Sequence, residues 1–174
     1  MTIDLTAVEP TRRGRARRRV LRALLAVTMV LGAISLTAGT ASAAQVCTGA
    51  RDSNVCLAIN GVGNGQYAVH VGIDDHISGA DAQEYIDDAG DPFTVWIRGY
   101  DNGPNEFLFR LPMTDIGASD AFGLSADFDL TVPGAWLNED SGTDEIVAVL
   151  TLTDTDTNTV TRTFTSPVII GNWP

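Results

Sequence analysis

Beyond residue 44, hydrophobic and polar residues alternate along most of the chain. From Leu124 to Val132 every second residue is apolar, while Asp127 and Asp129 lie among the polar residues in between. This period of two places apolar side chains on one face of a β-strand and polar side chains on the other. Seven segments show the pattern: residues 54–59, 66–73, 93–99, 105–111, 123–132, 145–153 and 159–170. Turn-forming residues separate the segments, so we predict seven strands.

The number and spacing of these strands predict the fold class. Short strands separated by regular turns are typical of antiparallel all-β folds. We predict an immunoglobulin-like antiparallel β-sandwich of about seven strands, formed by residues 44–174 as a single domain. The Cys-Trp-Cys core signature of antibody domains is missing, because both cysteines precede Trp96. One short helix is expected at residues 80–88, with Gly90 as its end.

Threonine occupies every second position of the last predicted hairpin, from Thr151 to Thr165. A five-residue turn at residues 154–158 predicts two facing pairs, Thr153 with Thr159 and Thr151 with Thr161. The other face then collects a core layer of apolar residues: Ile146, Ala148, Leu150, Leu152, Val160 and Phe164. A turn with an even number of residues would place threonines opposite apolar residues, so we predict the odd turn.

The first 43 residues have the features of an export signal. Seven arginines lie between residues 12 and 22, and an uncharged apolar stretch from Ala23 to Gly39 follows them. The segment ends in Ala41-Ser42-Ala43, a small-residue sequence that signal peptidases cleave. We therefore predict a cleaved signal peptide over residues 1–43 and a secreted, extracellular domain. The alternative is an uncleaved membrane anchor, against which the Ser and Thr residues late in the apolar stretch argue.

Two export routes remain open for this signal. The sequence Arg17-Arg18-Arg19-Val20-Leu21-Arg22 resembles a twin-arginine export signal, in which an arginine pair precedes one free position and apolar residues. Ala16 stands where such signals usually carry Ser or Thr. The general secretory pathway is the other route, and both routes deliver the domain outside the cytoplasm.

The predicted domain is strongly acidic. The chain has 11 arginines, no lysine and 22 acidic residues, and residues 1–43 hold seven of the arginines but only two of the acids. The remaining four arginines and 20 acids give residues 44–174 a net charge of −16. Nucleic acid phosphates and anionic lipids repel such a polyanion, so we expect neither as a partner after signal cleavage.

The chain contains two cysteines, Cys47 and Cys56, both close to the predicted cleavage site. In an oxidising compartment two cysteines at this spacing are expected to form a disulfide. Closing so short a loop stabilises the N-terminal segment by about 2 to 3 kcal/mol. The alternative is a reactive or metal-binding thiol pair, which lacks the further Cys or His of a soft-metal site.

Two acidic segments are candidates for calcium binding. Asp74 and Asp75 follow a predicted strand, while Asp154, Asp156 and Asn158 form the D-x-D-x-N start of a calcium loop. Ca²⁺ takes six to eight oxygen ligands, which carboxylates and amides supply. The glycine and the later glutamate of an EF-hand are missing, and Asp and Asn also favour turns without any metal. We hypothesise Ca²⁺ as a stabilising ion and predict no other cofactor.

Patterns typical of catalysis are scarce. His70 lies on the polar face of a predicted strand and His76 in an acidic loop, without the H-E-x-x-H spacing of zinc enzymes. The nucleophile sequence G-x-S-x-G is absent, and both cysteines are expected to be bonded. Paired carboxylates such as Asp74 and Asp75 could serve a hydrolase, although among 20 acids some pair is always present. We therefore predict no catalytic residues.

Aromatic residues indicate a binding surface instead. Trp96 and Tyr100 share one face of a predicted strand, opposite Val95 and Ile97, and Trp136 lies in a loop. Exposed aromatic rings stack on sugars or anchor protein partners. The alternative for Trp96 is a place in a core that buries both faces of its strand.

Together these observations favour a non-catalytic secreted β-sandwich that binds an extracellular protein or a polysaccharide, with Ca²⁺ as a stabilising ion. The first alternative is a secreted protease inhibitor, which would present residues 101–105 or 114–122 as a rigid loop to a protease. The second alternative is a small hydrolase that depends on carboxylates or a metal.

Overall fold

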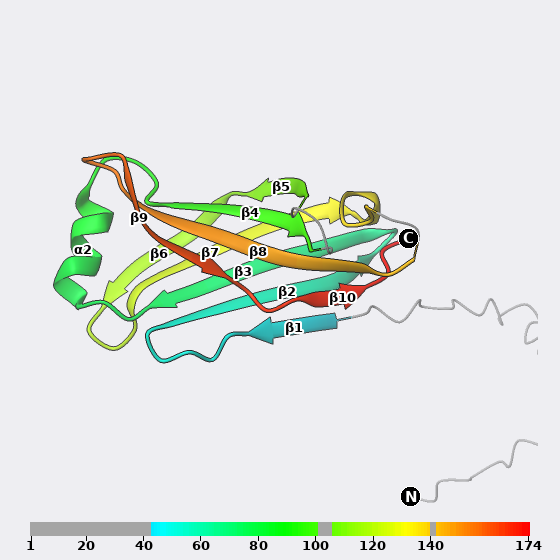
Figure 1. Cartoon of the computed structure of the whole chain (residues 1–174), viewed down its shortest axis with the longest axis horizontal. Helices are drawn as coiled ribbons and strands as arrows, with labels where there is room; N and C mark the ends of the chain where they lie inside the picture. Colours follow the sequence, from blue (N-terminus) through cyan, green and yellow to red (C-terminus); the bar gives the residue numbers. More distant parts are fainter. Residues whose placement is uncertain (1–42, 101–105, 140–141) are drawn as a thin grey trace, which may run out of the picture. The chain divides into compact units, whose positions relative to one another are not determined.

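The computed structural model describes residues 43–100, 106–139 and 142–174, which form two antiparallel β-sheets packed face to face (Figure 1). Residues 1–42, which include nearly all of the predicted signal peptide, lie outside the described residues. The two packed sheets confirm the prediction of an all-β sandwich. Within the described ranges, no helix has the length and apolar character that crossing a membrane requires.

The first sheet has the strand order β1-β2-β3-β7-β6. Its strands are β1 (Ala43–Cys47), β2 (Ser53–Gly63), β3 (Gln66–Asp75), β6 (Met113–Ser119) and β7 (Gly123–Pro133). The second sheet has the order β10-β8-β4-β5, and β9 also pairs with β8. Its strands are β4 (Phe93–Gly99), β5 (Phe107–Leu111), β8 (Asp144–Asp154), β9 (Thr159–Thr165) and β10 (Ile169–Gly171).

The chain crosses between the sheets at three places. Helix α2 (Gly79–Asp87) joins β3 to β4, Pro112 separates β5 from β6, and the 3-10 helix η1 (Gly134–Trp136) lies between β7 and β8. Figure 1 shows α2 at the same end of the sandwich as the β8–β9 turn, while η1 lies at the opposite end. These two ends therefore carry the non-strand elements that could shape a site.

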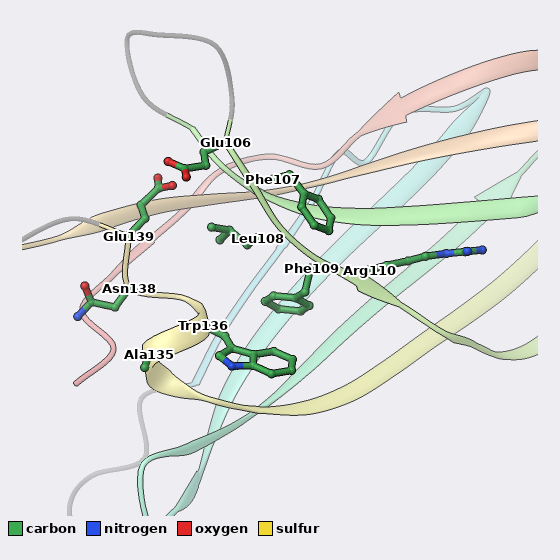
Figure 2. A pocket seen from close by; sticks show the side chains of 9 residues that line it. All are labelled: Glu106, Phe107, Leu108, Phe109, Arg110, Ala135, Trp136, Asn138 and Glu139. Atoms are coloured by element: carbon green, nitrogen blue, oxygen red, sulfur yellow. The ribbon is translucent and has the colours of Figure 1, made fainter.

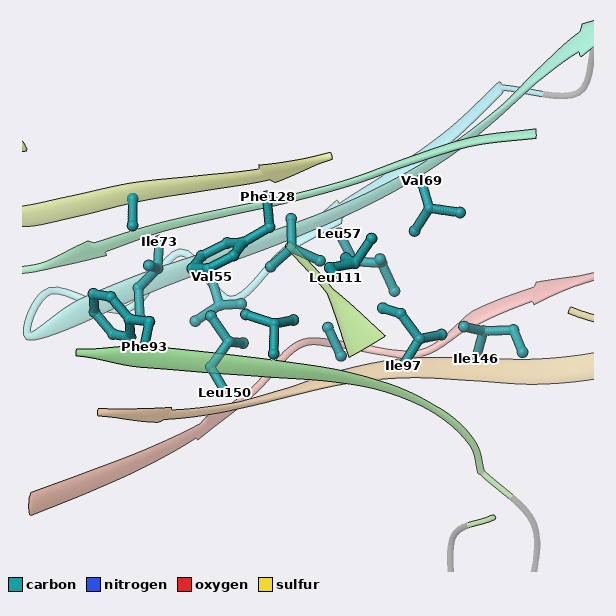
Figure 3. Packing of buried hydrophobic residues seen from close by; sticks show 14 of the residues in the cluster. Val55, Leu57, Val69, Ile73, Phe93, Ile97, Leu111, Phe128, Ile146 and Leu150 are labelled. Carbon is teal, nitrogen blue, oxygen red and sulfur yellow. The ribbon is translucent and has the colours of Figure 1, made fainter. Parts of the chain in front are cut away.

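Apolar side chains from both sheets fill the space between them (Figure 3). Phe93 of β4 and Phe128 of β7 meet edge to face across this core, with ring centroids 6.1 Å apart. Leu57, Leu150 and Leu111 are also fully buried. Burying one such side chain contributes about 1.5 to 3 kcal/mol, so the inward faces of the alternating strands supply most of the stability.

The predicted strands largely match those observed. Residues 54–59, 66–73, 93–99, 105–111, 123–132 and 145–153 correspond to β2, β3, β4, β5, β7 and β8. Strands β1 and β6 are missing from the prediction. Strand β1 begins at the predicted cleavage site, and β6 contains a bulge that breaks its alternation. The helix expected at residues 80–88 is α2, whose first turn is capped by the Ser78 hydroxyl, 3.1 Å from the amide of Asp81.

The last predicted strand, residues 159–170, is divided into β9 and β10. Between them, the Ser166 hydroxyl accepts a hydrogen bond from the amide of Ala148 at 2.9 Å. The same hydroxyl lies 2.9 Å from the carbonyl oxygen of Pro167, to which it donates. The Ser166 amide donates to the carbonyl oxygen of Ala148 at 2.9 Å, so at this break the serine hydroxyl takes the place of the Ser166 carbonyl oxygen as the acceptor for Ala148.

The predicted register of the last hairpin is wrong. The observed pairs are Asp154 with Thr159, Thr153 with Val160, Leu152 with Arg162, Thr151 with Thr163 and Leu150 with Phe164. The turn therefore has four residues, 155–158, and a bulge at Thr161 restores the facing of threonines one pair later. Leu152 is buried as predicted, but Val160 is 56% exposed and does not belong to the core. An even turn is tolerated because the bulge corrects its phase.

Cys47 and Cys56 form the predicted disulfide. They are direct cross-strand partners on β1 and β2, with Cα atoms 4.0 Å apart. The bond therefore fixes β1 to the edge of the first sheet. Among the described residues no free cysteine remains.

Candidate functional site

A groove lined by aromatic side chains lies between β5 and η1, and we call it the aromatic groove. Its volume is about 540 Å³. Its lining residues are Glu106, Phe107, Leu108, Phe109, Arg110, Ala135, Trp136, Asn138 and Glu139. It contains Trp136, which the sequence predicts as part of a binding surface, and it adjoins Trp96.

The local sequence of η1 explains why Trp136 points outward. Leu137 is fully buried, while the neighbouring Trp136 is 51% exposed. The amide of Gly134 donates to the carbonyl oxygen of Gly65 at 2.8 Å, and a side chain at Gly134 would collide with the backbone of Pro174. The glycine and the buried leucine thus hold this turn against the body and present the indole ring to solvent.

A bulge in β5 determines which of its aromatic residues reaches the surface. Arg98 pairs with Phe107 and Ile97 pairs with Phe109, so Leu108 is an extra residue between them. Phe109 therefore faces the core at 6% exposure, while Phe107 is 52% exposed. The sequence assigns both phenylalanines to one apolar face, and the bulge separates them.

Two aromatic contacts connect the groove to the surface of the second sheet. The rings of Phe109 and Trp136 lie 5.8 Å apart, and those of Trp96 and Phe107 lie 4.9 Å apart at 75°. Trp96 is half-buried on the outer face of β4, so the two-sided core reading of this residue does not hold. Tyr100, the third predicted residue, is 47% exposed just beyond β4. Trp173 is buried and belongs to the core.

Polar groups border the aromatic floor. Figure 2 shows the carboxyl groups of Glu106 and Glu139 turned toward one another, with Leu108 between them and the rings of Phe109 and Trp136. Asn138 donates from its side-chain amide to the carbonyl oxygen of Trp173 at 3.2 Å. Both carboxylate oxygens of Glu139 are buried, whereas Glu106 is exposed, so the groove combines flat apolar surface with the Glu106 carboxylate at its edge.

Asp74 and Asp75, which the sequence names as calcium or hydrolase candidates, have different surroundings. Asp74 accepts a hydrogen bond from the Ser125 hydroxyl at 2.7 Å. Asp75 is fully buried and forms an ion pair with Arg162 of β9. Successive residues of a strand point to opposite faces, so the two carboxylates do not act on one point.

Asp154, Asp156 and Asn158 lie in or beside the β8–β9 turn. The carboxylate of Asp154 accepts hydrogen bonds from the amides of Asp156 and Thr157, at 3.1 and 3.2 Å. Asn158 adopts the left-handed conformation, with φ of 52°. Both features are those of turn-forming residues.

This turn and helix α2 enclose a second groove, which we call the acidic groove. Its volume is about 560 Å³, and its lining residues are Ile77, Asp81, Glu84, Tyr85, Asp88, Asp154, Asp156 and Thr157. Loss of hydration, followed by the charges of Asp156 and Asp154, raises the pKa of Asp88 above its usual 3.8. Across the described ranges, no three His, Cys, Asp or Glu side chains are arranged to hold a metal ion.

Of the two segments proposed as inhibitory loops, only one lies within the described residues. Residues 101–105 lie outside the described residues. Residues 114–119 belong to β6, which pairs with β7 at the edge of the first sheet. The second segment is therefore mostly a strand rather than a free loop.

Comparison of the chain with protein-family models, curated proteins and solved structures gives no match.

Proposed function

We propose that this protein is a non-catalytic extracellular domain that binds a polysaccharide through the aromatic groove. The observation that carries the proposal is the exposed pair Trp136 and Phe107, each in ring contact with a second aromatic residue. Exposed rings that are fixed by neighbours lose little conformational freedom on binding. They suit a ligand with flat apolar faces.

Sugar rings present such faces together with a rim of hydroxyl groups. In the aromatic groove, Glu106 supplies carboxylate acceptors, and Arg110 lines the other end, with its guanidinium extended away from Glu106 (Figure 2). Ligand sites usually pair an apolar lining with a few polar groups that fix orientation. Because residues 44–174 carry a net charge of −16, we favour a neutral polysaccharide over an anionic one.

The finer fold type belongs to the same proposal. The order β2-β3-β7-β6 facing β10-β8-β4-β5 corresponds to strands A-B-E-D facing G-F-C-C′ of immunoglobulin-like sandwiches, with β1 as an added edge strand. This correspondence supports the immunoglobulin-like type. Loops at the ends of such sandwiches commonly carry binding sites, and η1 lies at one of these ends.

Secretion is also part of the proposal. The Cys47–Cys56 disulfide supports it, since such bonds persist in oxidising compartments and are rare in the cytosol. Mass spectrometry of the protein recovered from the culture medium should give a chain that begins at Ala44. A cell-retained chain with an intact N-terminus would contradict this part.

Retention on insoluble polysaccharides tests the binding function. The purified protein is mixed with cellulose, chitin or xylan, and the bound fraction is measured against protein concentration. Trp136→Ala should weaken binding to the recognised polymer about tenfold, which corresponds to about 1.4 kcal/mol. Phe107→Ala should weaken it in the same direction.

Phe122→Ala is the matched control. Phe122 is 57% exposed, similar to Trp136, but it lies before β7 and does not line the aromatic groove. Its substitution should leave binding unchanged. Equal losses in the Phe122 and Trp136 variants would contradict the proposal, as would the absence of binding to every polymer. Binding to an extracellular protein instead would favour the other kind of partner that the sequence predicts.

A further inference from the structure

His70 lies between two carboxylates on the outer face of the first sheet, away from both grooves. It pairs in register with Asp129 of β7, whose Oδ1 is 2.9 Å from its Nδ1. Its other ring nitrogen, Nε2, lies 3.7 Å from Oδ1 of Asp127. The His70 side chain is 37% exposed, and both carboxylates are about half exposed, so solutes can reach this group.

A bulge in β6 supports the Asp129 carboxylate. Met113 pairs with Phe128 and Asp115 with Asp127, so Thr114 is the extra residue between them. Its hydroxyl lies 2.9 Å from Oδ2 of Asp129. Bulges redirect side chains in this way next to functional sites. The result is a chain of contacts from Thr114 to Asp129 to the Nδ1 of His70.

Gly72 keeps the space between His70 and Asp127 open. It lies two residues along β3 from His70 and pairs with Asp127. A Cβ at this position would lie 3.2 Å from Oδ1 of Asp127 and 3.4 Å from Nε2 of His70. Any side chain here would therefore crowd both of these atoms.

We propose that Nε2 of His70 and Oδ1 of Asp127 bind a divalent transition-metal ion, such as Zn²⁺. Ligand atoms about 2.0 to 2.1 Å from a tetrahedral zinc ion lie about 3.3 Å apart, close to the separation found here. Histidines that bind metals almost always hold their other ring nitrogen against a carboxylate or carbonyl, which fixes the ring. Asp129 holds Nδ1 of His70 in this manner, and Thr114 in turn holds Asp129.

The site offers two protein ligands, fewer than the three or four of catalytic and structural zinc sites. Water completes the coordination, and we expect binding weaker than the tight binding of a zinc finger. The competing use of the same geometry is an ion pair between a protonated His70 and the two carboxylates. A metal titration distinguishes these two uses.

Titration of the purified protein with ZnCl₂ in a non-chelating buffer is the test, followed by calorimetry and by NMR of the histidine ring nitrogens. One equivalent of Zn²⁺ should bind and shift the Nε2 resonance of His70. His70→Gln and Asp127→Asn should each weaken binding at least tenfold. His76→Gln is the matched control, because the other histidine contacts the Arg51 carbonyl and lies away from this group.

Two further variants separate a metal site from general attraction to an acidic surface. Gly72→Ala keeps both ligands and should weaken Zn²⁺ binding by filling the space between them. Asp129→Asn should weaken binding less than loss of a ligand, and should change the ring tautomer of His70 in the metal-free protein. Zn²⁺ binding that survives His70→Gln, or no binding at millimolar ZnCl₂, would overturn the proposal.

Discussion

Asp75 and Arg162 join the two sheets through an ion pair at one end of the sandwich. Asp75 ends β3 of the first sheet and is fully buried, whereas Arg162 belongs to the edge strand β9 of the second. Burial raises the pKa of Asp75, and the positive charge of Arg162 opposes this rise. The pair thus ties an exposed edge strand to the opposite layer.

Removal of the Arg162 charge should destabilise the fold. In Arg162→Gln the Asp75 carboxylate remains buried without its cation, so we expect the free energy of unfolding to fall by about 2 to 3 kcal/mol. This is below the usual cost of breaking a fully buried pair, because the Arg162 side chain is 44% exposed. Urea denaturation at pH 7 measures the change.

The loss of stability in Arg162→Gln, relative to the wild type, should become smaller as the pH falls. Because its pKa is raised, the Asp75 carboxyl binds a proton more tightly in the folded state than in the unfolded state, where the pKa has its ordinary value of 3.8. Protonated Asp75 therefore favours folding below the unfolded-state pKa, and this contribution to stability is lost as the pH rises through the folded-state pKa. Arg162→Gln should enlarge the effect. Asp75→Asn combined with Arg162→Gln should abolish it, and persistence in the double variant would contradict this origin.

The disulfide should stabilise the edge strand β1. Replacing both Cys47 and Cys56 by Ser should lower the free energy of unfolding by about 2 to 3 kcal/mol, because the closed loop restricts the unfolded chain. Hydrogen exchange should become faster first in β1, which pairs only with β2 in the sheet. Unchanged exchange in β1 would show that its pairing with β2 suffices without the bond.

Leu152 and Val160 provide a direct test of the hairpin register. The predicted register places both in the core, whereas in the structure Leu152 is buried and Val160 is 56% exposed. Leu152→Ala should cost about 2 to 5 kcal/mol through lost contacts and a cavity. Val160→Ala should change stability by no more than about 0.5 kcal/mol. Similar losses of stability in the two variants would contradict the observed register and support the five-residue turn that the sequence predicts.

The acidic groove should respond to removal of one charge. Asp156 and Asp154 both raise the pKa of Asp88, so Asp156→Asn should lower that pKa and raise the melting temperature at pH 7. The sign follows because ionisation of Asp88 in the folded state becomes less costly. NMR titration of the carboxyl carbons gives the pKa directly. An unchanged Asp88 titration would contradict the coupling.

Calcium should act through the same repulsion. Millimolar Ca²⁺ should raise the melting temperature of the wild type above its value in a chelator, and the increase should be smaller in Asp156→Asn. Magnesium at equal concentration and ionic strength is the control for general screening. Identical melting temperatures with Ca²⁺ and with chelator would show that calcium does not stabilise the fold.

Periodicity predicts the sandwich well, because one buried face forces alternation on each strand. It fails where the backbone departs from a regular strand. The bulges at Leu108, Thr114 and Thr161 each add a residue that has no partner, and after each one the facing of side chains is reversed. Amino-acid type alone does not reveal such positions. They account for the exposed Phe107 and the unpredicted strand β6.

The candidate sites were only partly visible for a related reason. The sequence identifies Trp136 because it is a tryptophan beside turn-forming residues. Its partner Phe109 lies on strand β5, far away in the sequence, so their contact can be found only once the fold is known. The surroundings of His70 likewise depend on residues about 60 positions away, brought close by the pairing of β3 with β7. Contacts across strands depend on register, which sequence patterns specify least.

The extra residue in β5 has a consequence for how this surface can vary. Since Leu108 decides that Phe107 lies outside, a homologue with the same aromatic residues but a regularly paired β5 would hide that ring. The exposed aromatic surface that we propose as a binding site can therefore be gained or lost through insertion and deletion in a single strand, with every aromatic side chain retained.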